Sequence, residues 1–181
     1  MNRIYTFIVF LFLVQINVAQ DKFFTKEGYV SFFSHTIVED IKADNNQVLS
    51  IVDRTTGEIV IQLLMRSFQF KKALMQEHFN ENYVESYKYP KATFKGNILN
   101  NNETDEGDFE TEISGVLSVH GKEKEISTMT KVTKNKDELI LTGHFMVKVA
   151  DFDIKIPGIV ANNIAKNIEI TFELKYKPYN Q

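Results

Sequence analysis

The chain has 181 residues, of which 43% are hydrophobic and 25% are charged. This is the usual composition of one soluble globular domain, and it excludes a largely disordered chain and a polytopic membrane protein. The 21 Lys and Arg residues form no basic cluster and are outnumbered by 24 Asp and Glu residues, which argues against nucleic-acid binding. The sequence contains no cysteine, so disulfides, zinc fingers and thiol catalysis are excluded.

The N-terminus has the pattern of a secretory signal. Arg3 gives it a positive start, residues 4–14 are almost entirely apolar, and Ala19 is a small residue at a suitable cleavage point. The apolar run is shorter than the roughly 20 residues that a membrane span needs, which favours cleavage over a membrane anchor. We expect a signal peptide over residues 1–19 and an exported domain over residues 20–181, in the periplasm or outside the cell, with no stable membrane span after cleavage.

Alternation of apolar and polar residues predicts β-strands through most of the remaining chain. The first half contains β-prone segments at residues 29–33, 48–52, 58–68 and 92–99. The alternation is clearer in the second half, at residues 109–119, 126–132, 139–149 and 168–177. About eight antiparallel strands, each with one dry face, are typical of a closed barrel or a sandwich.

Three segments interrupt the strands. Residues 100–108 are rich in Asn, Asp and Glu and lie between two alternating segments, so we expect a hairpin loop there. Residues 71–80 pair Leu74 with His78 at helical spacing and predict a short helix, and Pro157 opens a short turn before the last strand. Aromatic residues around the predicted helix either cap one end of a barrel or form an ordinary small core: Phe68, Phe70, Phe79, Tyr83, Tyr87 and Tyr89.

Three glycines fall in the middle of dry strand faces, at Gly96, Gly115 and Gly143. Glycine inside a strand marks a bend or a close backbone approach, and an interior glycine can also leave empty volume. Both interpretations favour a barrel over a sandwich, because an eight-stranded barrel bends strongly and is just wide enough for side chains or one small ligand.

If the barrel holds a cavity, its wall is apolar and its ligand is long and apolar, held by burial. The inward positions of the predicted strands and helix then give the candidate ligand-binding residues: Ile61, Leu63, Phe79, Phe94, Gly96, Ile98, Ile113, Gly115, Leu117, Leu141, Gly143, Phe145, Ile170 and Phe172.

No pattern in the sequence points to catalysis, a metal or a cofactor. The chain has no Gly-x-Ser-x-Gly elbow, and none of His35, His78, His120 and His144 has a second histidine at ligand-pair spacing. His120 stands beside Gly121 at a predicted strand end, and we expect a turn residue that hydrogen-bonds the backbone. Arg66, Lys71 and Lys72 either meet a phosphate at the barrel rim or are simply solvated.

Several motifs follow one another in the order of a known family. They are the Met-Arg-Ser-Phe at 65–68, the stretch 78–86, the Tyr-Pro-x-Ala-x-Phe at 89–94, the Leu-x-Val-His-Gly at 117–121 and the stretch 151–157. In this order the chain resembles the YceI-like, polyisoprenoid-binding family over nearly all of the predicted domain.

The resemblance implies an extended, lipocalin-like, eight-stranded antiparallel barrel with a short helix over one end. It also implies an apolar pore for an isoprenoid or another long-chain lipid, in an exported bacterial protein without catalytic residues. Two departures bear on the ligand rather than the fold. Asp153 stands where the family often has glycine, and residues 71–75 replace an Arg/Asp-rich helix opening.

Three functions are therefore compared. The first is an exported lipid-binding protein whose partner is a long-chain lipid or isoprenoid, with no nucleic acid and with homodimerisation left open. The second is a structural or stress-related envelope protein with a filled barrel. The third is a small lipid-modifying enzyme, for which only Thr111, Thr128 and Thr130 give inward polar groups.

Overall fold

The computed structural model describes residues 22–99 and 106–179. The predicted signal segment and most of the predicted 100–108 loop lie outside these residues. The described chain is mostly strand, and its strands are β1 (Lys22–His35), β2 (Asp40–Asp53), β3 (Glu58–Leu64), β4 (Gln69–Phe70), β5 (Lys91–Ile98), β6 (Gly107–Val119), β7 (Lys122–Lys134), β8 (Leu139–Lys148) and β9 (Asn167–Pro178). The helical pieces are α1 (Ala73–His78), the π turn η2 (Phe79–Tyr83) and the short 3₁₀ turns η1 (Met65–Ser67), η3 (Val149–Phe152) and η4 (Gly158–Val160).

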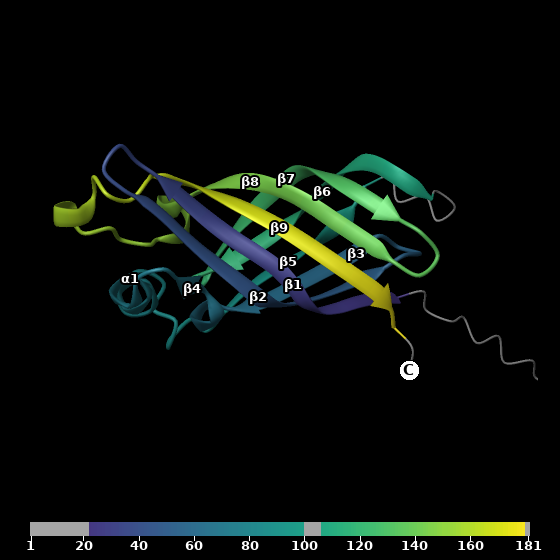
Figure 1. Cartoon of the computed structure of the whole chain (residues 1–181), viewed down its shortest axis with the longest axis horizontal. Helices are drawn as coiled ribbons and strands as arrows, with labels where there is room; N and C mark the ends of the chain where they lie inside the picture. Colours follow the sequence, from purple (N-terminus) through teal and green to yellow (C-terminus); the bar gives the residue numbers. More distant parts are fainter. Residues whose placement is uncertain (1–21, 100–105, 180–181) are drawn as a thin grey trace, which may run out of the picture.

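The eight long strands close into an antiparallel barrel. Their hydrogen-bonded order is β1-β9-β8-β7-β6-β5-β3-β2, and β1 pairs with β2 to complete the ring. The two-residue β4 pairs with β2 at Ala43 and Asp44. In Figure 1 α1 lies at one end of the barrel and the end of β9 lies at the other. The predicted eight-stranded barrel with a short helix at one end is confirmed.

Strand β6 illustrates why these residues form the wall. Thr111 and Ile113 are buried while Glu110 and Glu112 are exposed, as an alternating sequence requires when only one face is dry. The β6–β7 register pairs Val119 with Lys122, so the loop has two residues. His120 and Gly121 have φ values of 52° and 71°, the left-handed conformation that a tight hairpin turn needs.

The sequence-based boundaries are wrong in three places. The strand expected over 58–68 ends at Leu64, which pairs with Lys91 on β5. The next residue, Met65, lies opposite Pro90, whose carbonyl accepts a hydrogen bond from Met65 but which has no N–H to continue the ladder. The first two strands are much longer than the β-prone cores at 29–33 and 48–52, because cross-strand pairing extends through polar flanking residues. The helix expected over 71–80 is α1 followed by the π turn η2.

The half of the barrel near the end of β9 is filled by side chains. Phe23, Leu141, Leu174 and Tyr176 are completely or almost completely buried there. Burial raises the pKa of Tyr176 far above its ordinary value, and its hydroxyl lies 2.7 Å from Ser50 Oγ. The opposite half, under α1, is not filled, and it holds the candidate site.

Candidate functional site

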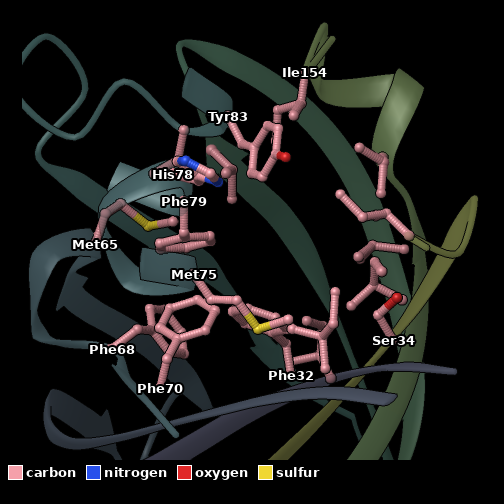
Figure 2. A pocket seen from close by; sticks show the side chains of 18 of the residues that line it. Phe32, Ser34, Met65, Phe68, Phe70, Met75, His78, Phe79, Tyr83 and Ile154 are labelled. Atoms are coloured by element: carbon pink, nitrogen blue, oxygen red, sulfur yellow. The ribbon is translucent and has the colours of Figure 1, made fainter. Parts of the chain in front are cut away.

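A cavity of about 450 Å³ occupies the half of the barrel beneath α1. Figure 2 shows its labelled side chains pointing toward a common space, with Phe68, Phe70 and Phe79 on one side and Ile154 on another. Most of the other lining residues are aliphatic. The exposed residues Lys72, Leu74 and His78 also line it, so the cavity reaches the surface. We call this open end the mouth.

Phe79 anchors the helical cover of the cavity. The π turn η2 places it against three aromatic rings, with centroid distances of 5.3 Å to Phe32, 5.8 Å to Phe68 and 5.0 Å to Phe70. Aromatic contacts of this kind contribute about 0.5–1.5 kcal/mol each beyond the burial of their area. Of the six aromatic residues expected to form a cap or a small core, Phe68, Phe70 and Phe79 form this cluster and Tyr83 lines the cavity. The expectation is wrong for Tyr87, which is fully exposed, while Tyr89 packs against His120.

The charged groups at the mouth are paired with protein groups. Lys72 Nζ lies 2.7 Å from Glu39 Oε1, and Asn163 Nδ2 donates to Glu39 Oε2 at 3.4 Å. The hydrogen bond from Lys72 is the main cause that lowers the pKa of Glu39 below its usual value. This contact joins the β1–β2 turn, the start of α1 and the segment after η4. Arg66 and Lys71 are exposed and do not line the cavity.

A second cavity of about 90 Å³ lies deeper in the barrel. It shares six lining residues with the large cavity, so these residues surround the passage between the two; we call them the neck. They come from β1, β3, β5, β6, β8 and β9: Val30, Leu63, Ala92, Leu117, Phe145 and Ile170.

Gly96, Gly115 and Gly143 lie in the barrel wall against the rings of Phe94 and Phe172, and we call this part of the barrel the waist. Gly96 and Gly115 face each other across β5 and β6, and a Cβ on either would collide with the backbone of the other strand. A Cβ on Gly143 would lie 2.6 Å from Cζ of Phe172, its partner on β9. The interpretation of these glycines as empty volume is therefore wrong. They permit close backbone approach and make room for phenylalanine rings.

Residues 15–176 match the model of the YceI-like domain. The chain belongs to the YceI-like domain family. No curated protein shows significant sequence similarity to the chain.

Solved structures with this YceI-like fold share little sequence with the chain. A polyisoprenoid-binding domain from Saccharophagus degradans, implicated in plant cell wall breakdown, is 16% identical, with a TM-score of 0.76 over 88% of this chain and 99% of that one. Burkholderia cenocepacia BcnA is 17% identical, with a TM-score of 0.69 over 82% and 95%. The Campylobacter jejuni YceI protein is 13% identical, with a TM-score of 0.64 over 81% and 90%. At these identities the similarity shows the fold alone.

The candidate residues separate into two groups in this YceI-like barrel. One group lines the large cavity, the small cavity or both: Ile61, Leu63, Phe79, Phe94, Ile113, Leu117, Phe145, Ile170 and Phe172. The other group lines neither: Gly96, Gly115 and Gly143 lie beneath aromatic rings, while Ile98 and Leu141 belong to the packed core.

Two lining segments were missed in the sequence. Ile41 lies in the extension of β2, beyond the β-prone core at 48–52, whereas Phe32 lies within the predicted segment 29–33 but was not named as a lining residue. Phe152, Ile154 and Ile156 line the cavity from an irregular segment after β8. These last three residues alternate with polar ones, which was a usable signal even though no strand forms there.

His120 joins three segments beside the cavity. Its Nδ1 donates to the Phe152 carbonyl at 2.9 Å, its Nε2 lies 2.8 Å from Glu85 Oε2, and its ring meets the edge of Tyr89 at a centroid distance of 4.5 Å. The predicted turn role with a backbone hydrogen bond is confirmed. Its partners also include a carboxylate and a ring, which the sequence did not indicate.

Within residues 22–99 and 106–179, no helix has the length and apolar character required to cross a bilayer.

Proposed function

We propose that this protein binds an isoprenoid or another long-chain apolar lipid in the cavity and performs no catalysis on it. The observation that carries the proposal is the cavity of about 450 Å³, within the usual range for ligand sites, with a wall of aliphatic and aromatic side chains. The barrel is filled in one half and hollow in the other. An interior left hollow in only one half is more consistent with a ligand site than with loose packing throughout the barrel.

The mouth favours a ligand whose polar end carries little charge. Lys72 lines the cavity but is already paired with Glu39, so an added anion would face a carboxylate as well as an ammonium. An alcohol or a carbonyl head group is therefore a better match to these residues than a diphosphate.

The two alternative functions have less support. A filled barrel predicts packing throughout, whereas only the half around Tyr176 is packed. An enzyme needs polar groups that converge inside the cavity. Thr111 and Thr130 are buried but line neither cavity, and Thr128 lines the small one and donates to the His144 carbonyl. The charged residues that line the large cavity, Glu39 and Lys72, are bonded to each other at the mouth.

Export is part of the proposal. We propose that residues 1–19 are removed as a signal peptide and that the mature protein acts in the periplasm or outside the cell. Cleavage leaves 181 − 19 = 162 residues. Intact-mass measurement of the protein recovered from its host tests this, since a full-length mass would contradict it.

A matched pair of variants on β6 tests the site. Val119 lines the cavity, whereas Val116 lies on the exposed face of the same strand. Val119→Trp should fill part of the cavity and weaken binding of the apolar dye Nile red at least tenfold, while Val116→Trp should leave it unchanged. Native mass spectrometry of the wild type should also detect a co-purified apolar molecule. A wild type that carries no such molecule and binds no Nile red would refute the proposal.

A further inference from the structure

We infer that Phe94 and Phe172 form the floor of the ligand site and thereby set the longest apolar chain that the protein accepts. The inference rests on the proposed function and adds a specificity to it. It comes from the packing at the waist, where aromatic rings and glycines occur together.

Each ring of the floor lies against bare backbone. The tip of the Phe94 ring lies 2.8 Å from the position that a Cβ would take on Gly96 or on Gly115. The tip of the Phe172 ring lies 2.6 Å from the position that a Cβ would take on Gly143. The glycines therefore leave the room that the rings fill. Both rings also line the small cavity, so they face the lumen on their other side.

Below the floor the barrel is filled by side chains. Leu141, Leu174 and Tyr176 are completely buried there and line neither cavity. A chain that enters at the mouth passes the neck, fills the space of the small cavity and then meets Phe94 and Phe172. Any further carbons must remain in the mouth, in contact with water.

This geometry predicts a plateau in affinity against chain length. Each methylene that becomes buried increases affinity about fourfold, because its transfer from water is favourable. Once the chain reaches the floor, an added methylene gains almost nothing. Removing one ring should move the plateau to longer chains, because the glycine behind the ring has no side chain to occupy the space.

Linear primary alcohols from octanol to octadecanol, displacing Nile red from the full chain, give the test. The wild type should show increasing affinity and then a plateau. Phe94→Ala and Phe172→Ala should shift the plateau by several carbons to longer alcohols. Gly143→Ala should shift it to shorter ones, since its Cβ pushes the Phe172 ring into the lumen. Phe94→Leu and Phe172→Leu are milder variants, and a smaller shift in the same direction is expected.

Phe23→Ala is the matched control, because Phe23 is buried in the packed half and lines neither cavity. Its plateau should equal that of the wild type. If folded floor variants have the same plateau as the wild type, or if the plateau of Phe23→Ala shifts as far as theirs, the inference that Phe94 and Phe172 limit chain length is refuted. The proposal of lipid binding would not be affected by that result. If the wild type binds neither Nile red nor any alcohol, the proposed function itself fails.

Discussion

The glycines of the waist give a graded prediction for stability. A methyl group at Gly115 meets the Lys95 carbonyl oxygen and the Gly96 Cα, which belong to a paired strand and cannot move without breaking the ladder. At Gly143 it first meets the tip of the Phe172 ring at 2.6 Å, and a ring can shift. At Gly158 nothing lies within 4 Å of the new methyl group.

These contacts set the expected magnitudes. Overpacking usually costs about 1–3 kcal/mol, so we place Gly143→Ala near about 1 kcal/mol and Gly115→Ala at about 3 kcal/mol, the upper end of that range. Gly158→Ala should stabilise the fold by about 0.4–1 kcal/mol, because alanine reduces the entropy of the unfolded chain without strain.

Urea unfolding measures the series. With a typical slope of about 2 kcal/mol per molar urea, the midpoint should fall by roughly 1.5 M for Gly115→Ala and rise slightly for Gly158→Ala. The slope itself should not change. A Gly115→Ala midpoint equal to or above that of Gly143→Ala would refute the view that backbone contact, rather than ring packing, holds the waist between β5 and β6.

Three further predictions concern polar contacts. Ser50 donates to the Val60 carbonyl at 2.9 Å and so accepts a hydrogen bond from the Tyr176 hydroxyl. Ser50→Ala should destabilise the fold by about 2 kcal/mol, because the buried Tyr176 hydroxyl loses its partner. The double variant Ser50→Ala with Tyr176→Phe should lower the urea midpoint less than Ser50→Ala alone. His120→Ala should destabilise by about 2 kcal/mol through two lost hydrogen bonds, and it should speed hydrogen exchange in residues 79–89; unchanged exchange there would contradict the joining role. Because the pKa of Glu39 is lowered in the fold, its pairing with Lys72 is present at neutral pH and lost as the pH falls from the ordinary Glu value of 4.5 through the lowered pKa. The protection factors of the α1 amides, which are corrected for the intrinsic pH dependence of amide exchange, should therefore fall on acidification in the wild type but show no such step in Glu39→Gln.

The sequence by itself determined the strands and their dry faces. Alternation places Thr111 and Ile113 on one face and Glu110 and Glu112 on the other, and this pattern has a period of two whatever surrounds the strand. The turn at His120 and Gly121 was equally local, because a two-residue hairpin needs a positive φ at both positions. The order of motifs also pointed to the YceI-like family.

Only the tertiary structure decided where the barrel is hollow. The sequence shows that Gly96, Gly115 and Gly143 face inward but not what lies opposite them, because a glycine leaves space that a neighbouring strand or ring can take. Here the backbone of the paired strand and the rings of Phe94 and Phe172 take it. The open volume lies instead beneath Phe79, where a helical turn and an irregular segment from distant parts of the chain meet over the barrel end. Such long-range packing depends on contacts between residues far apart in sequence, and no local pattern encodes it.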